Sequence, residues 1–233
     1  MNDSHSLQPE LLRWSVGHAV VLTVVTLATA AGLPLTLLSW CGALSFSLLV
    51  YRCRGRWTPA GRFGPANAVS LLRLSGMFVL PWLMPWQIVC CGLILLAMDG
   101  VDGWIARSTG LAGEFGEFID KESDAFFTLM LCVLLYRLPE GFGPWILLPG
   151  LLRYLFVLFV KLARPPAPKE QRSPKASWIS CLMMLTLLFS FAAYPAYLDY
   201  CRPLAILMML VLVYSFAESL YLIYTAPRER QQT

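Results

Sequence analysis

Long apolar runs dominate this sequence and leave few ways for the chain to fold. Eight such runs follow one another, each near the roughly 20 residues that an α-helix needs to cross a bilayer. They cover about 15–32, 34–51, 67–85, 86–106, 122–138, 144–163, 177–196 and 203–224. The chain is 58% hydrophobic and 14% charged, whereas soluble domains are about 25% charged. We therefore predict an all-α polytopic membrane protein.

The positions of lysine and arginine predict how these spans are oriented. Short loops that face the cytoplasm carry an excess of positive residues. With eight spans, only Arg137 and Arg202 fall on one side. The other side receives Arg13, Arg52, Arg54, Arg56, Arg62, Arg107, Lys121, Lys161, Arg164, Lys169, Arg172, Lys175, Arg228 and Arg230. Both termini and the connection between the fourth and fifth spans are therefore expected in the cytoplasm.

Four aspartates interrupt the apolar pattern around that connection. Asp99 and Asp102 lie three residues apart at the end of the fourth span, and Asp120 and Asp124 lie four apart at the start of the fifth. Each pair therefore shares one helix face. Two helices that met there would bring four carboxylates together, and such a cluster usually exists to hold cations. Oxygen ligands without His or Cys favour Mg²⁺, Mn²⁺ or Ca²⁺.

The residues near the aspartates indicate what such cations would do. A pair of divalent ions is the usual clamp for phosphoryl chemistry. Arg107 adds a fixed cation for a phosphate, and Gly103 lets that phosphate approach the helix closely. The histidines, His5 and His18, are both near the N-terminus, so acid-base chemistry at the aspartates must be carboxylate chemistry. These features favour a metal-dependent phosphotransfer at a membrane surface.

Eight positions around the aspartates follow the fixed spacing D-x2-D-G-x2-A-R-x8-G-x3-D-x3-D. They are Asp99, Asp102, Gly103, Ala106, Arg107, Gly116, Asp120 and Asp124. This pattern resembles the signature of the CDP-alcohol phosphatidyltransferases, and the general plan from about residue 60 to 224 resembles theirs as well. The resemblance implies a six-helix catalytic core. The first two spans add about two N-terminal transmembrane helices outside that core, and the resemblance does not give their role.

On this plan the chain has five parts. Residues 1–14 are a cytoplasmic N-terminal segment, and 15–51 form the two additional transmembrane helices. A basic interfacial loop, 52–66, leads into the six-helix catalytic transmembrane domain, 67–225. Residues 226–233 are a cytoplasmic tail. The expected location is a bacterial inner (plasma) membrane, with the active site on the cytoplasmic side.

The resemblance also implies roles for the signature residues. The metal ligands, for two Mg²⁺ or Mn²⁺ ions, would be Asp99, Asp102, Asp120 and Asp124. Of these, Asp124 would also be the catalytic base that takes the proton from the acceptor hydroxyl. The cytidine diphosphate part of the donor would be held by Gly103, Ala106, Arg107 and Gly116. Our leading hypothesis is transfer of a phosphatidyl group from CDP-diacylglycerol to a small polar hydroxyl acceptor, with release of CMP, in phospholipid biosynthesis.

Two other functions stay open at this stage. A soluble CDP-alcohol can serve as donor with diacylglycerol as acceptor, and the signature does not separate this direction from the first. A cation-coupled transporter would also use intramembrane carboxylates, although the sequence lacks broken helices in two matching halves. The expected partners are membrane lipids and, from the resemblance, a second copy of the chain in a homodimer. No nucleic-acid partner is expected.

The acceptor pocket is less defined than the aspartate stretch. Arg153 lies in the middle of the apolar run 144–163, where it either binds an acceptor phosphate or pairs with a cluster aspartate or Glu218. Arg73 is a second candidate, because Asn67, Ser70 and Arg73 are similar to an N-x-x-T-x-x-R start of the first core span, with serine in place of threonine. Arg153 and the basic loop of Lys169, Arg172 and Lys175 suit a phosphorylated acceptor, and glycerol 3-phosphate is a common acceptor in the family that the chain resembles. It is therefore the favoured acceptor, while serine, inositol phosphate and others stay open.

Three glutamates near the aspartates lie outside the signature. They are Glu114, Glu117 and Glu122. We expect all three to be solvated.

Overall fold

The structure, a computed structural model, describes residues 7–163 and 174–225. Within these residues the chain is all helical and has no strand, which confirms the all-α part of the predicted fold class. Eight α-helices follow in order: α1 (Gln8–Ala30), α2 (Thr36–Arg52), α3 (Pro65–Val79), α4 (Pro85–Thr109), α5 (Glu114–Arg137), α6 (Leu147–Ala163), α7 (Pro174–Ala193) and α8 (Leu198–Thr225). Two short 3₁₀ helices, η1 (Leu80–Trp82) and η2 (Pro144–Ile146), precede α4 and α6.

Several helix ends differ from the apolar runs for local reasons. Helix α1 begins well before residue 15, because Pro9 and Glu10 in its first turn suit a helix N-terminus. Helix α3 ends at Val79, short of the expected residue 85. Pro81 falls in the η1 turn that follows, and proline cannot donate the backbone hydrogen bond of a continuing helix.

Five of the described helical segments are long and apolar enough to cross a membrane. They are Gln8–Ala30, Pro85–Thr109, Pro144–Ala163, Lys175–Ala193 and Leu198–Tyr224. Helices α2 and α3 have 17 and 15 residues, and the first turns of α5 carry the acidic residues of the signature. The protein is thus an integral multi-pass membrane protein, although fewer helices qualify as spans than the eight expected.

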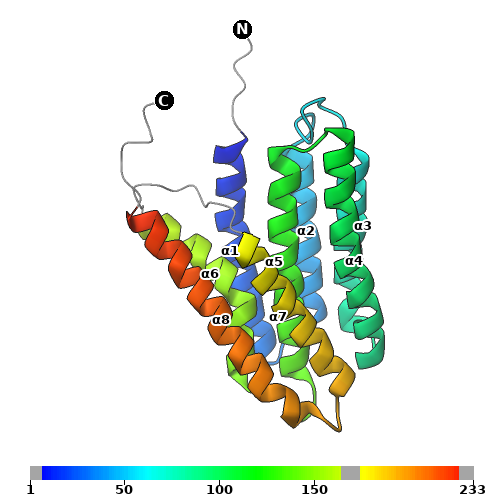
Figure 1. Ribbon diagram of the computed structural model, residues 1–233, viewed down its shortest axis with the longest axis vertical. Coiled ribbons are helices and arrows are strands. Elements are labelled where there is room, and N and C mark those ends of the chain that lie inside the picture. The colour runs from blue at the N-terminus through cyan, green and yellow to red at the C-terminus, as the bar shows by residue number, and fades with distance from the viewer. Residues whose placement is uncertain (1–6, 164–173, 226–233) are drawn as a thin grey trace.

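Helix α5 is the centre of the bundle. Helices α1 to α5 run close to the long axis of the molecule, whereas α6, α7 and α8 are tilted against them (Figure 1). Helix α5 packs against α1, α3, α6 and α7. Every residue from Phe126 to Leu135 is buried, as expected for a helix that is apolar on all sides. The position of α5 therefore fixes where the acidic residues at its N-terminal end lie.

The connection within the signature and the residues Arg137 and Arg202 lie at different ends of the bundle. The connection between α4 and α5 and the loop between α2 and α3 lie at the same end (Figure 1). At the other end, Arg137 donates a hydrogen bond to the Thr29 carbonyl (2.8 Å), and Arg202 donates one to the Glu140 carbonyl (3.4 Å). Five of the cytoplasmic cations expected from the sequence lie outside the described residues: Arg164, Lys169, Arg172, Arg228 and Arg230. The tail 226–233 also lies outside the described residues.

Candidate functional site

The aspartates of α4 and α5 converge in the structure. Carboxylate oxygens of Asp99, Asp102 and Asp120 all lie within 4.8 Å of one another; we call these three residues the aspartate cluster. They come together because a short connection joins the end of α4 to the start of α5, and α3 packs against both helices. Asp124, one turn further along α5, is not part of this set but lies next to it.

A buried arginine from α3 joins Asp124 to the aspartate cluster. The side chain of Arg73 is 1% exposed, and its guanidinium forms ion pairs with Asp99, Asp120 (3.4 Å) and Asp124 (3.2 Å). It also donates a hydrogen bond to the Ser123 hydroxyl. A planar guanidinium with five N–H donors suits this arrangement. Arg73 thus supplies the positive charge that offsets these carboxylates, and it is not among the residues that line the cavity described below.

The aspartate cluster has the donor chemistry that a hard divalent cation requires. Asp102 is 2% exposed, and one of its carboxylate oxygens accepts a hydrogen bond from the Ser70 hydroxyl at 2.8 Å. Its other oxygen, Oδ1, is buried and has no hydrogen-bond partner among the described residues. A buried polar atom without a partner is rare in proteins and calls for an explanation such as an ion. The three carboxylates of the aspartate cluster, one of which has this unpartnered oxygen, therefore fit Mg²⁺ or Mn²⁺.

The other signature residues lie close in sequence to the aspartates. A side chain at Gly103 would place its Cβ 3.2 Å from Nη1 of Arg107, so glycine leaves room for that guanidinium against the helix. A Cβ at Gly116 would lie 3.4 Å from Oδ1 of Asn67. Ala106 is half-buried and Arg107 is exposed. The four residues predicted to hold the nucleotide therefore lie on the same two helix ends as the aspartates.

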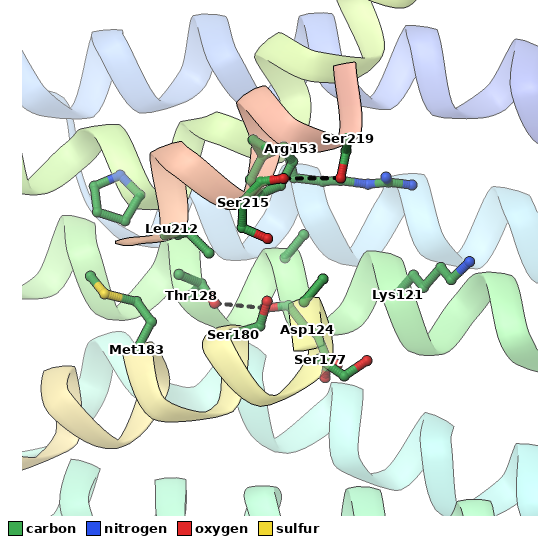
Figure 2. Close-up of a pocket in the computed structure, with 14 residues that line it drawn as sticks. Lys121, Asp124, Thr128, Arg153, Ser177, Ser180, Met183, Leu212, Ser215 and Ser219 are labelled. Carbon is green, nitrogen blue, oxygen red and sulfur yellow. Dashed lines mark hydrogen bonds between the residues drawn. The ribbon is translucent and has the colours of Figure 1, made fainter. Parts of the chain in front are cut away.

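A cavity of about 150 Å³ opens between α5, α6, α7 and α8 (Figure 2). Its polar lining consists of Lys121, Asp124, Thr128, Arg153, Ser177, Ser180, Ser215 and Ser219. Asp124 borders this cavity and also pairs with Arg73 beside the aspartate cluster. The Asp124 carboxylate, which can accept a proton, therefore lies between the aspartate cluster and the cavity. The cavity is lined by hydroxyl groups and by the cations of Lys121 and Arg153.

The aspartate spacing and this geometry agree with a comparison against protein families. The family model of the CDP-alcohol phosphatidyltransferases matches residues 63–217. The chain belongs to this family. Its members are metal-dependent enzymes that act on CDP-alcohols, so the transporter hypothesis is set aside. Comparison with curated proteins and with solved structures gave no match.

In this CDP-alcohol phosphatidyltransferase, two helices lie outside the family match. The match begins after α2 and ends within α8. Helices α1 and α2 are therefore additions to the part that the family shares. They nevertheless pack against it, since α1 contacts α5 and α6 and α2 contacts α3.

One prediction about the glutamates of this phosphatidyltransferase was wrong. Glu114 and Glu117 are exposed as expected, but Glu122 is fully buried. At 100° per residue, Glu122 points about 200° away from Asp120 around α5. It therefore faces α1 and α6, where Arg153 supplies its counter-charge at 3.0 Å.

Arg153 also lines the cavity, where its side chain is 15% exposed. It forms an ion pair with Glu122, a partner that was not expected for it from the sequence. The sequence indicated that Arg153 and Glu122 each need a partner, because both charged residues lie in apolar runs. Helical periodicity does not indicate which helix α6 packs against, so it did not identify the pair. The predicted roles of Arg153 and Arg73 in acceptor binding stay predictions.

Proposed function

We propose that this enzyme transfers a phosphatidyl group from CDP-diacylglycerol to a small polar hydroxyl acceptor and releases CMP, in phospholipid biosynthesis. The observation that carries the proposal is the convergence of Asp99, Asp102 and Asp120 within 4.8 Å of one another. Asp124 adds a carboxylate at the border of the adjacent cavity. The family supplies the class of donor, and the membrane-spanning helices supply access for a lipid.

We propose that the aspartate cluster and Asp124 hold two Mg²⁺ or Mn²⁺ ions. Such ions, when bound, stabilise negative charge on the attacking and leaving oxygens of a phosphoryl transfer. Neighbouring side chains orient the carboxylates for these ions, since Ser70 fixes Asp102, and Arg73 holds Asp99, Asp120 and Asp124. Preorganised groups of this kind need no rearrangement during the reaction.

In the proposed reaction, the signature residues first bind the donor and then accept the proton of the acceptor. Gly103, Ala106, Arg107 and Gly116 bind the cytidine diphosphate part of the donor. Asp124 accepts the proton of the acceptor hydroxyl. The acceptor oxygen forms a bond to the phosphorus that carries the diacylglycerol, the bond from that phosphorus to the bridging pyrophosphate oxygen breaks, and CMP leaves with the electron pair.

Glycerol 3-phosphate is our favoured acceptor. Arg153 and Lys121 give the cavity two cations, and its serine hydroxyls offer hydrogen bonds to a polyol. Both cations have acidic partners, Glu122 at 3.0 Å and Glu117 at 3.5 Å, so a phosphate must compete with these carboxylates. Lys175, from the basic loop, is exposed, whereas Lys169 and Arg172 lie outside the described residues.

We further propose that all eight helices span the membrane, as a six-helix core with two N-terminal helices added. The position of Arg137 and Arg202 at the end opposite the aspartate cluster supports an active site and termini on the cytoplasmic side. A bacterial inner membrane and a homodimer, both expected from the family resemblance, complete this proposal.

The test is CMP release by the purified enzyme from CDP-diacylglycerol with a panel of acceptors: glycerol 3-phosphate, serine and inositol phosphate. Parallel reactions offer CDP-choline or CDP-ethanolamine with diacylglycerol. We expect acceptor-dependent CMP release only with CDP-diacylglycerol. Release only with the soluble donors would reverse the proposed direction of transfer, and equal rates with every acceptor would remove glycerol 3-phosphate as the favoured substrate.

A further inference from the structure

A buried hydrogen-bonded chain connects the N-terminal helices to the wall of the cavity. Oε1 of Glu122 accepts a hydrogen bond from the Ser15 hydroxyl of α1 at 3.2 Å and another from Nη2 of Arg153 at 3.0 Å. Ser15 is 3% exposed and Glu122 is fully buried. Ser15 thus lies outside the family match but touches a charged pair inside it.

Contacts with α2 hold the face of α1 that carries Ser15. The indole N–H of Trp14 donates a hydrogen bond to the Ser45 carbonyl at 2.9 Å, and Nδ1 of His18 lies 2.8 Å from the Ser45 hydroxyl. The rings of Trp14 and His18 also stack, with centroids 4.2 Å apart. Helices α1 and α2 are therefore linked around Ser45, and this pair presents Ser15 to α5.

The Glu122 carboxylate is sensitive to the loss of a donor. The hydrogen bonds from Ser15 and Arg153 both go to the same oxygen, while Oε2 is buried without a partner among the described residues. In surroundings of low polarity, each remaining donor to a buried carboxylate matters more than it would in water. Without the Ser15 hydroxyl, the carboxylate is free to move relative to α1, and the Arg153 guanidinium that it holds moves with it.

We propose that Ser15 is a positioning residue, through which the N-terminal helices set the place of Arg153 in the cavity and thereby the affinity for the acceptor. Arg153 and Asp124 line the same cavity, so a shift of the guanidinium changes the acceptor site without reaching the aspartate cluster. This inference rests on the proposed function in one respect, namely that the acceptor binds in this cavity.

The first experiment compares Ser15→Ala and Ser15→Thr with the control Thr26→Val. Thr26 is fully buried on the same helix, and its hydroxyl contacts no described partner. We expect Ser15→Ala to raise the KM for the acceptor about fivefold while kcat and the KM for the donor stay within about twofold. Ser15→Thr keeps the hydroxyl and should keep the low KM, as should Thr26→Val. An unchanged acceptor KM in Ser15→Ala, or an equal rise for donor and acceptor, would overturn the proposal.

A second experiment needs no catalysis and so separates this inference from the proposed function. Phenylglyoxal modifies arginine, and peptide mass spectrometry reports the rate at Arg153, with the exposed Arg107 as internal reference. We expect Ser15→Ala to raise the Arg153 rate about threefold and Thr26→Val to leave it unchanged. An unchanged rate in Ser15→Ala would contradict the positioning role. If the wild-type enzyme released no CMP with any donor, the proposed function would be rejected. The rate of Arg153 modification would still test whether Ser15 positions Arg153.

Discussion

Asp124 lies where the aspartate cluster and the cavity meet. It pairs with Arg73 on one side and lines the cavity with Arg153 on the other. A general base must lie within reach of the proton that it accepts, and of the four signature aspartates Asp124 is the one among the cavity-lining residues. This position supports the proposal that Asp124, besides holding metal with Asp99, Asp102 and Asp120, acts as the base.

Replacing Asp124 with asparagine tests that role. Asp124→Asn keeps the size of the side chain but cannot accept the proton, so we expect CMP release to fall about a thousandfold with little change in thermal unfolding. The matched control is Glu114→Gln, which neutralises an exposed carboxylate on the same helix and should leave turnover intact. Near-wild-type turnover in Asp124→Asn would rule out the assignment of the base.

Arg73 gives a prediction about stability. Arg73→Gln removes the cation that offsets Asp99, Asp120 and Asp124, whose side chains are 28% to 41% exposed. Solvent screens charges that are partly exposed, so we expect a loss of about 2 kcal/mol in the free energy of unfolding rather than the larger cost of a fully buried pair. Thermal unfolding with EDTA measures the loss.

Divalent cations provide the second half of the Arg73 test. Adding Mn²⁺ should recover more stability in Arg73→Gln than in the wild type, because the carboxylates then lack their own counter-charge. Arg62→Gln, in the exposed basic loop, serves as the control and should behave as the wild type does. Equal stability of Arg73→Gln and wild type in EDTA would show that the arginine does not offset the carboxylates.

At the scale of elements, the contact between α5 and α6 holds the cavity in shape. Gly150 on α6 lies against α5, and a Cβ there would come within 2.7 Å of the Leu129 Cα. A backbone atom cannot move aside as a flexible side chain can. The separation of the two helices, and with it the position of Arg153 one turn further along α6, therefore depends on this glycine.

Gly150→Ala tests the helix contact. We expect the substitution to push α6 away from α5, lower the free energy of unfolding by about 2 kcal/mol and reduce CMP release. In the control Gly17→Ala, the new Cβ meets no atom within 4 Å; stability should stay the same or rise by up to about 1 kcal/mol. Calorimetry or a thermal shift assay compares the two, and identical melting temperatures would contradict the packing argument.

The helices themselves were predictable from the sequence, because apolar runs, prolines and loop charges are local signals. The convergence of Asp99, Asp102 and Asp120 followed from their positions on two consecutive helices. The burial of Glu122 and the place of Arg73 did not follow, since each depends on which distant helix supplies a partner. Ser15 and Arg153 reach Glu122 across 107 and 31 residues of sequence, and no periodicity encodes such a pairing.

At the scale of the whole molecule, the connection between α4 and α5 lies at one end of the helix bundle, together with the basic loop between α2 and α3 (Figure 1). The end of α5, which carries Arg137, and the start of α8, which carries Arg202, lie at the opposite end (Figure 1). A lipid donor in the bilayer and a water-soluble acceptor can both reach a site at a membrane face.

Cysteine labelling tests the proposed orientation. Ser108, at the end of α4, and Asp199, at the start of α8, are both exposed. A membrane-impermeant maleimide should label Ser108→Cys only in inverted membrane vesicles and Asp199→Cys only in intact cells, with the unsubstituted chain as the background for native cysteines. Labelling of both from the same side would exclude the proposed eight-span arrangement.

The measurement that tests the central claim most directly is CMP release from CDP-diacylglycerol by the purified enzyme as a function of divalent cation. The enzyme is first depleted with EDTA and then titrated with Mg²⁺ or Mn²⁺ in the presence of glycerol 3-phosphate. We predict that depletion abolishes CMP release, that either cation restores it, and that Asp102→Asn prevents the recovery. Undiminished CMP release in EDTA would contradict the assignment of the aspartate cluster as a metal site.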